Sequence, residues 1–317
     1  MKQEFKRKLR EFSYRSNAFS AIYHIASDLK TRRYANMPDE EYLKMMFKIK
    51  TGNVLNLDNP VGFNEKLQWL KLYNRRPEYT IMVDKVLAKE LVAGILGKEY
   101  IIPTLGVWSN PDDINFEKLP NQFVLKCNHN SGGGMCICTD KTSLNIERIK
   151  RNLLKGLKSN SFLASREWPY KNVSRKVLAE EFMKDNNNKS LVDYKFYCFH
   201  GKPRFLYVGL ANYHDGKKND ELTYLDLEWN PAPFYRTDHK PFPYVLERPG
   251  KFDEMLLLAT KLAEGIPFVR VDLYYINGKV YFSEFTFFPG GGFNEFKPYG
   301  WEKTIGSWID LSLVKVD

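Results

Sequence analysis

The segment FVLKCNHNSGGGM, residues 123–135, joins a strand-like run that carries a lysine to a loop with three successive glycines. Glycine adopts positive φ without steric cost and lets backbone N–H groups approach an anion, while Lys126 supplies a point charge. The pattern predicts a loop that lies against phosphates. It is not a Walker or Rossmann motif, because no GxxxxGK[ST] occurs and no GxGxxG follows a strand. The alternative is a flexible hairpin with an exposed lysine.

A second group of chemically capable residues lies on the last predicted hairpin, FVRVDLYYING followed by KVYFSEFTFF, with its turn at Asn277-Gly278. Counted outward from this turn, Asp272 and Glu284 can face each other inside apolar runs, where an unpaired carboxylate is costly. Adjacent carboxylates repel unless a cation joins them, and their oxygens suit Mg²⁺ together with phosphate and water oxygens.

Arg270 lies two residues before Asp272, so strand alternation places both on one face. The arginine can therefore pair with Asp272 or bind a phosphate. A purely structural cluster of Arg270, Asp272 and Glu284 explains the same pattern, and the residues alone leave both interpretations open.

The elements that must position these residues are helical first and mostly β-stranded later. Helical periodicity covers residues 39–50, 63–73, 80–97, 144–158 and 252–265. Strand-like segments lie near 101–108, 122–126 and 135–138, and most of the chain from residue 176 onward is also strand-like. The sequence predicts an α+β protein with a helical N-terminal extension.

The composition predicts a soluble globular protein of one large or two medium domains, with 317 residues, 43% hydrophobic content and a mean hydropathy of −0.46. No apolar run approaches the ~20 residues of a membrane span, so we expect cytoplasmic residence. The four cysteines form neither a disulfide framework nor a CxxC spacing. We expect buried free thiols.

The formal net charge of +10 is partly concentrated near the N-terminus. The basic residues of this cluster are Lys2, Lys6, Arg7, Lys8, Arg10, Arg15, Lys30, Arg32 and Arg33. Apolar residues at helical spacing between them permit peripheral contact with anionic lipid, and a solvated helix packed on the body is the simpler alternative. Nucleic acid is not expected as a partner, because no RNP, zinc-finger or helix-turn-helix pattern accompanies the charge.

Lys85, the Lys126 loop, the segment at 180–183 and the Asp272/Glu284 hairpin occur in the order and approximate spacing of ATP-grasp ligases. The chain resembles this superfamily over roughly residues 80–290. The similarity extends to the TupA-like amidoligases of teichuronopeptide biosynthesis, which are often called glycosyltransferases. It rests on LNLDNPVGFNEKLQWLKLY, DKVLAKELV, DYKFYCFHGKP and SEFTFFPGGG.

The resemblance implies an ATP-grasp fold, in which two α+β subdomains clasp ATP. We predict a helical extension at 1–75, an N-terminal subdomain with the glycine loop at 76–170, and a C-terminal subdomain with the hinge and the metal-binding hairpin at 171–317.

The resemblance also implies roles for individual residues. Lys85 and Lys126 would contact the nucleotide phosphates, and Asp272 and Glu284 would hold Mg²⁺. The mobile lid would be formed by Gly132, Gly133 and Gly134. The hinge whose backbone reads adenine would be formed by Glu180, Glu181, Phe182 and Met183. Lys126, Lys195 and Arg270 are the candidate catalytic residues.

Two positions depart from the general ATP-grasp pattern. Thr286 occupies the place of an asparagine in the metal motif, so a metal ion would be held there more weakly or through water. Lys195 stands where related ligases often have an arginine, which keeps the charge and loses the bidentate fork. Asp193 is a further nucleotide-site candidate, whose partner could be the ribose, a metal ion or Lys195.

The implied reaction is carboxylate activation by ATP with Mg²⁺, followed by attack of an amine and formation of an amide. The TupA-like branch suggests an amino acid or amine joined to a uronic acid of a capsular or cell-surface glycan, at the cytoplasmic side of the membrane. A sugar-nucleotide glycosyltransferase is the main alternative. It predicts an Asp-x-Asp metal motif, which the sequence lacks; the nearest segment is Asp226-Leu227-Glu228. A noncatalytic nucleotide-binding protein is a third possibility.

Overall fold

The computed structural model describes residues 34–130, 133–186, 191–211, 213–214, 217–218, 221–244 and 246–316. The basic N-terminal cluster up to Arg33 and the predicted lid residue Gly132 lie outside these ranges. No helix in the described ranges is long and apolar enough to cross a membrane.

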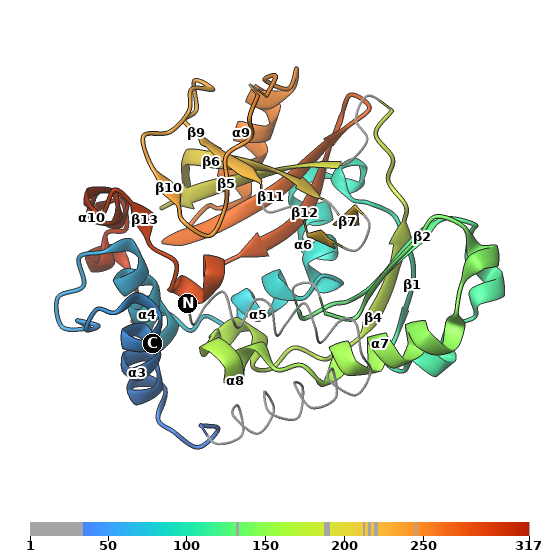
Figure 1. Ribbon diagram of the computed structural model, residues 1–317, viewed down its shortest axis with the longest axis horizontal. Coiled ribbons are helices and arrows are strands. Elements are labelled where there is room, and N and C mark those ends of the chain that lie inside the picture. The colour runs from blue at the N-terminus through green and yellow to red at the C-terminus, as the bar shows by residue number, and fades with distance from the viewer. Residues whose placement is uncertain are drawn as a thin grey trace.

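The described chain begins with helices and then alternates helices with antiparallel strands (Figure 1). The helices are α3 (Asp39–Thr51), α4 (Phe63–Tyr73), α5 (Glu78–Val83), α6 (Leu87–Leu96), α7 (Ile146–Lys158), α8 (Ser161–Ser165), α9 (Phe252–Leu262) and α10 (Gly300–Ser307). The strands are β1 (Thr104–Trp108), β2 (Phe123–Cys127), β3 (Met135–Cys138), β4 (Val177–Glu181), β5 (Leu191–Phe199), β6 (Lys202–Ala211), β7 (Tyr213–His214), β8 (Lys217–Lys218), β9 (Leu222–Leu225), β10 (Tyr235–Arg236), β11 (Phe268–Ile276), β12 (Lys279–Thr286) and β13 (Phe296–Lys297). The predicted α+β class is confirmed.

Two antiparallel sheets form the body of the protein. The four-stranded sheet has the order β1-β4-β2-β3, and the five-stranded sheet has the order β12-β11-β5-β6-β9. Although β4 follows residue 171, it pairs with β1 and β2 in the first sheet. The division of the chain into subdomains stays a prediction.

One helix covers one face of each sheet. Ile149 and Leu153 of α7 pack with Phe123 and Leu125 of β2. On the five-stranded sheet, α9 packs through Phe252, whose ring centroid lies 5.8 Å from that of Phe196 on β5. The helices α5 and α6 lie between the two sheets, at the centre of Figure 1. The residues for which the sequence predicts a chemical role lie in this region.

The face of the five-stranded sheet opposite α9 carries an aromatic core. Tyr197 of β5 stacks on Phe205 of β6 with a centroid distance of 4.4 Å, and Phe63 of α4 packs edge-on against Phe268 of β11 at 5.0 Å. Since side chains alternate along a strand, Lys195 shares the face of Tyr197, and Arg270 shares that of Phe268. Polar and aromatic residues therefore occupy one continuous surface.

The cysteines are free thiols, as expected. Cys127, Cys138 and Cys198 are buried, and Cys136 is half-buried.

Candidate functional site

The predicted single helix at 80–97 is wrong in one respect: it is broken between α5 and α6 at residues 84–86. The Asp84 carboxylate accepts a hydrogen bond from the backbone N–H of Val86 at 2.9 Å, in the turn just before α6. The backbone N–H of Lys85 donates to the carbonyl oxygen of Asn128 at 3.0 Å. These two contacts stabilise the break in the helix, and the second of them, to the distant Asn128, places Lys85 between the sheets.

Lys85 joins the segment after β2 to the final hairpin. Its Nζ donates to the carbonyl oxygen of Asn130 at 2.9 Å and lies 3.3 Å from Oε2 of Glu284 on β12. Lys85 therefore contacts both the segment that leads into the glycine loop and the hairpin that carries Asp272 and Glu284.

Asp272 and Glu284 are direct neighbours across β11 and β12, as predicted from the turn. Asp272 is fully buried, and Arg270 binds it in bidentate fashion, with Nε–Oδ1 and Nη2–Oδ2 distances of 2.7 Å each. Nζ of Lys195 lies 2.7 Å from Oδ2 of Asp272 and 3.2 Å from Oδ1 of Asp193. Arg270 also lies 3.7 Å from Glu284.

These side chains form what we call the ion network: Lys85, Asp193, Lys195, Arg270, Asp272 and Glu284. Its three cations balance its three carboxylates. The strand register explains the grouping, because Asp272 is paired with Lys195 on β5 as well as with Glu284 on β12. The protein itself thus supplies cations that join the two carboxylates.

Electrostatics favour the charged forms of Glu284 and Lys195. Burial raises the pKa of Glu284, but the charges of Lys85, Lys195 and Arg270 outweigh it and bring the pKa to about 2. Burial opposes the charge of Lys195, yet Asp193 and Asp272 raise its pKa well above the ordinary value. Asp193 differs, because burial raises its pKa and the other carboxylates add to that effect, while Lys195 opposes it.

A second charged cluster lies on the four-stranded sheet. The carboxylate of Glu180 on β4 is 2.5 Å from Nζ of Lys126 on β2 and 2.5 Å from Nζ of Lys89 on α6. Burial raises the pKa of Glu180, but the two lysines outweigh this effect and lower it. Sequence reasoning missed Lys89 as a site residue, although its position four residues after Lys85 could have indicated it.

The glycine loop is held firmly at its C-terminal end. Gly134 has φ of +65°, and a Cβ atom there would lie 2.7 Å from Sγ of Cys127 and 2.8 Å from Cα of Gly156 on α7. Glycine is required by this close approach as well as by the positive φ. Gly133 is exposed. The lid function of the loop stays a prediction.

The predicted adenine-reading segment begins at the end of β4. The backbone N–H of Glu181 donates to the carbonyl oxygen of Pro103 at 3.1 Å. Phe182 and Met183 follow outside the strand and are half-buried. Contact of these residues with a nucleotide stays a prediction.

The residues proposed for Mg²⁺ present oxygen atoms only. Glu284 is the more accessible carboxylate, with 27% of its side chain exposed, whereas Asp272 is engaged by Arg270 and Lys195. Oγ1 of Thr286 accepts a hydrogen bond from Arg270 at 2.9 Å. In the described part of the chain, no three His, Cys, Asp or Glu residues gather as a metal cluster. Few protein ligands and many phosphate or water oxygens are typical of Mg²⁺, so this donor set fits that ion.

A loop beside the β11–β12 hairpin is held by residues that sequence reasoning missed. In the loop Pro289–Gly292, Gly291 and Gly292 each have φ of +66°. The buried Lys71 of α4 donates to the carbonyl oxygen of Gly291 at 2.7 Å, that of Ser165 at 2.8 Å and Oε1 of Gln68 at 2.9 Å. Three acceptors match the three protons of an ammonium group.

Comparison with protein families matches this chain to the TupA-like ATPgrasp family over residues 65–310. The match covers well over half of the sequence, so the protein belongs to the TupA-like ATP-grasp family. The predicted ATP-grasp fold and the predicted branch are thereby confirmed. A comparison with curated proteins found no match.

The chain is also similar to several solved structures at low sequence identity. The D-alanine–D-alanine ligase from Bacillus anthracis complexed with ATP is 17% identical, with a TM-score of 0.36, over 65% of this chain and 53% of that chain. The corresponding ligase from Helicobacter pylori is 17% identical, with a TM-score of 0.39, over 67% and 56%. The ATP-grasp ligase PsnB complexed with minimal precursor, Mg and ADP is 11% identical, with a TM-score of 0.40, over 80% and 66%. The matched region is thus little more than half the length of the two D-alanine–D-alanine ligases.

Proposed function

We propose that the protein is an ADP-forming carboxylate-amine ligase that uses ATP as a substrate. The observation that supports this proposal is the position of Lys85, which contacts both the segment that leads into the glycine loop and Glu284 of the ion network. A polyphosphate between the sheets would meet cations from both sides: Lys126 and Lys85 from one, and Lys195 and Arg270 from the other.

This distribution of charge suits phosphoryl transfer, which depends mainly on positioning and on neutralisation of charge. In the proposed reaction, a carboxylate oxygen of one substrate bonds to the γ-phosphorus, and the bond between that phosphorus and the oxygen of ADP breaks. The amine nitrogen then bonds to the acyl carbon, phosphate leaves, and the amine loses a proton. Arg270 and Lys195 would stabilise the charge on the transferred phosphoryl group.

Asp272 and Glu284 would hold Mg²⁺, with Thr286 as a weaker or water-mediated ligand. When bound, the ion would neutralise phosphate charge. Asp272 must then share its oxygens with Arg270 or release Lys195, because both cations now contact it. Nζ of Lys195 lies 3.2 Å from Asp193, so Lys195 could stay paired with Asp193 after releasing Asp272.

For the substrates, we propose an amino acid or amine and a uronate-containing cell-surface glycan or its precursor. The net charge of +10 favours an anionic acceptor. We place the reaction in the cytoplasm, with contact between the basic N-terminal residues and the inner face of the membrane as a further part of the proposal. A glycosyltransferase remains the alternative.

The first test is to compare which nucleotide stabilises the protein against heat in the presence of Mg²⁺. We expect ATP to raise the melting temperature and UDP-sugars to leave it unchanged, since only a bound ligand shifts the unfolding equilibrium. Stabilisation by a UDP-sugar without any effect of ATP would favour the glycosyltransferase.

A further inference from the structure

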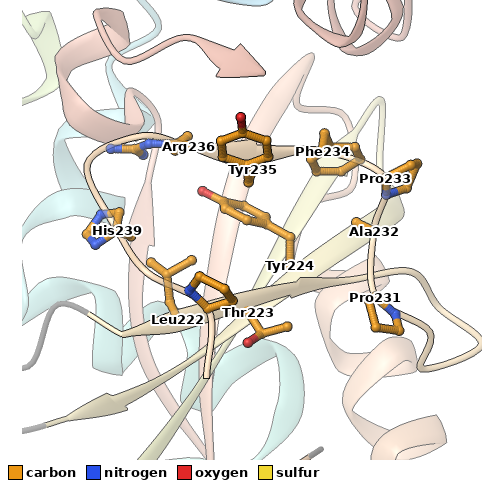
Figure 2. A pocket seen from close by; sticks show the side chains of 11 residues that line it. Leu222, Thr223, Tyr224, Pro231, Ala232, Pro233, Phe234, Tyr235, Arg236 and His239 are labelled. Carbon is orange, nitrogen blue, oxygen red and sulfur yellow. The ribbon is translucent and has the colours of Figure 1, made fainter. Parts of the chain in front are cut away.

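A cavity of about 390 Å³ lies beside β9, outside the ion network. Figure 2 shows its wall as an arch of chain that runs from Pro231 through Phe234, Tyr235 and Arg236 to His239. The ring of Tyr224, on β9, lies in the middle of this arch. Backbone hydrogen bonds attach both ends of the arch to β9, from Ala232 N–H to Tyr224 O and from Leu222 N–H to Lys240 O, at 2.9 Å each.

The cavity contains buried polar atoms whose hydrogen bonding is incomplete in the described structure. Tyr224 is 4% exposed, and its hydroxyl has no partner other than the neighbouring hydroxyl of Tyr197. Nδ1 of His239 is likewise buried without a partner, while Nε2 of the same ring lies 3.3 Å from the Asp238 carboxylate. A buried polar group without a full set of hydrogen bonds is destabilising, and a ligand that hydrogen-bonds to it removes this cost. The cavity is therefore polar enough to recognise hydroxyl groups.

The charge of the cavity is balanced by its own residues. The buried Arg236 is bound by Asp238, with Nε at 3.0 Å from Oδ1 and Nη2 in contact with Oδ2. Asp238 also accepts a hydrogen bond from Asn294 at 3.1 Å. Because the guanidinium is already neutralised, the cavity does not require an anion. Its remaining walls are aromatic and proline rings, which suit the apolar faces of a ring compound.

The cavity shares a face with the ion network. Tyr224 is the register partner of Tyr207 on β6, which is in turn the partner of Lys195 on β5. The rings of Tyr224 and Tyr207 are 5.4 Å apart, and the guanidinium of Arg270 lies 5.5 Å from the Tyr207 ring. Two strand spacings, about 10 Å, thus separate Tyr224 from Lys195. A ligand anchored in the cavity can reach the ion network only if it is longer than a single small unit.

We propose that this cavity binds an uncharged sugar ring of the acceptor, next to the unit that reacts at the ion network. A sugar ring combines apolar faces for the aromatic and proline walls with hydroxyls for Tyr224 and His239. This inference rests on the proposed ligase function for its purpose, while binding itself can be measured without ATP.

The test is sugar binding to the full-length protein in the absence of nucleotide. The probes are cellobiose and N,N′-diacetylchitobiose as neutral disaccharides, with glucuronic acid and tyrosine amide as the charged and amino-acid comparisons. Titration calorimetry and ligand-observed NMR should detect a neutral disaccharide. Tyr235→Ser and Tyr224→Phe should each weaken its binding by at least about tenfold.

Two features make the variants informative. Tyr235 is 56% exposed, so its replacement leaves the core intact, and the equally superficial Tyr299, at 46%, provides Tyr299→Ser as a control that should bind normally. Tyr224→Phe removes only a hydroxyl whose one neighbour is the hydroxyl of Tyr197, so its melting temperature should fall little. If Tyr224→Phe failed to fold, Tyr235→Ser would still decide the question.

The proposal is overturned if neither disaccharide binds, if both cavity variants bind as well as the wild type, or if only glucuronic acid or tyrosine amide binds through these residues. Sugar binding in a protein that forms no amide would refute the ligase function and leave the cavity assignment standing. Amide formation with unaltered substrate kinetics in both cavity variants would refute the cavity assignment alone.

Discussion

At the scale of single residues, the central feature is that protein cations occupy the space between the two carboxylates of the hairpin. Asp272 is held by Arg270 and Lys195, and Glu284 by Lys85 and Arg270. The expected repulsion between Asp272 and Glu284 is therefore already offset before any metal ion binds. Under the proposed function, the structural cluster and the phosphate site would be two states of the same residues, since each cation that holds a carboxylate could also bind a phosphate.

Asp272→Asn should destabilise the protein without Mg²⁺ by about 3–5 kcal/mol, because Arg270 and Lys195 would lose a buried charged partner. Denaturant unfolding measures the difference. Asp253→Asn is the matched control, because Asp253 forms the same kind of pair with Arg248 at 2.7 Å while its side chain is 83% exposed. An equal effect of both substitutions would contradict the assigned role of Asp272.

Glu284 should make stability depend on pH in a defined window. Its pKa of about 2 in the folded protein lies below the ordinary 4.5, so its contribution is present above about pH 4.5 and is lost as the pH falls toward 2. The difference in melting temperature between the wild type and Glu284→Gln should therefore be largest near neutral pH and shrink as the solution is acidified. A difference that stays constant, or grows in acid, would show that the charge of Glu284 is not stabilising.

Lys126→Ala should weaken ATP binding by roughly ten- to hundredfold, because a charged hydrogen bond contributes about 1.5–3 kcal/mol. Folding should persist, since Lys89 still pairs with Glu180. Calorimetry gives the affinity, and Lys150→Ala is the control. Its side chain is 21% exposed against 22% for Lys126, and it pairs with Asp112 at 3.2 Å, outside both charged clusters. Equal ATP affinity in Lys126→Ala and the wild type would remove Lys126 from the site.

At the scale of elements, α4 holds the loop Pro289–Gly292, which follows the β11–β12 hairpin. Lys71→Met should lower the stability by several kcal/mol, because three acceptors, two of them half-buried carbonyls, lose this donor. The carbonyl of Gly291 keeps a second donor, Nε2 of Gln68 at 3.3 Å. Lys66→Met on the same helix is the control, since Lys66 donates to a single carbonyl, that of Ile309. Thermal unfolding of both variants compares them. An equally small loss of stability in Lys71→Met and Lys66→Met would mean that the conformation of the glycines alone holds the loop.

The sequence predicts those elements whose causes are local. The hairpin follows from Asn277-Gly278 and strand alternation, and the facing of Asp272 and Glu284 follows from counting. The break in the helix at Lys85 could not be predicted, because the Asn128 carbonyl that holds it comes from a distant strand end. The hydrogen bond from Lys71 to the carbonyl of Gly291 could not be predicted for the same reason, because its acceptor lies in a distant segment. A lysine on an amphipathic helix is ordinarily a solvated residue.

At the scale of the whole molecule, the two sheets meet through charged side chains from α6 and the break before it. Lys85 links the segment after β2 to β12, and Lys89 links α6 to β4. A phosphate chain bound in this junction would take over some of these ion pairs, so ATP should stiffen the contact between the sheets. Cleavage by a protease in limiting amounts should consequently slow when ATP and Mg²⁺ are present.

The most direct measurement is the product analysis of a reaction that contains ATP, Mg²⁺, a uronate-containing glycan and hydroxylamine. We expect ADP, inorganic phosphate and a hydroxamate on the glycan, because hydroxylamine intercepts a phosphorylated carboxylate even when the natural amine is unknown. Lys126→Ala should lose this activity, and Lys150→Ala should retain it. Formation of AMP instead of ADP, or sugar transfer from a UDP-sugar without any need for ATP, would refute the proposed ADP-forming ligase.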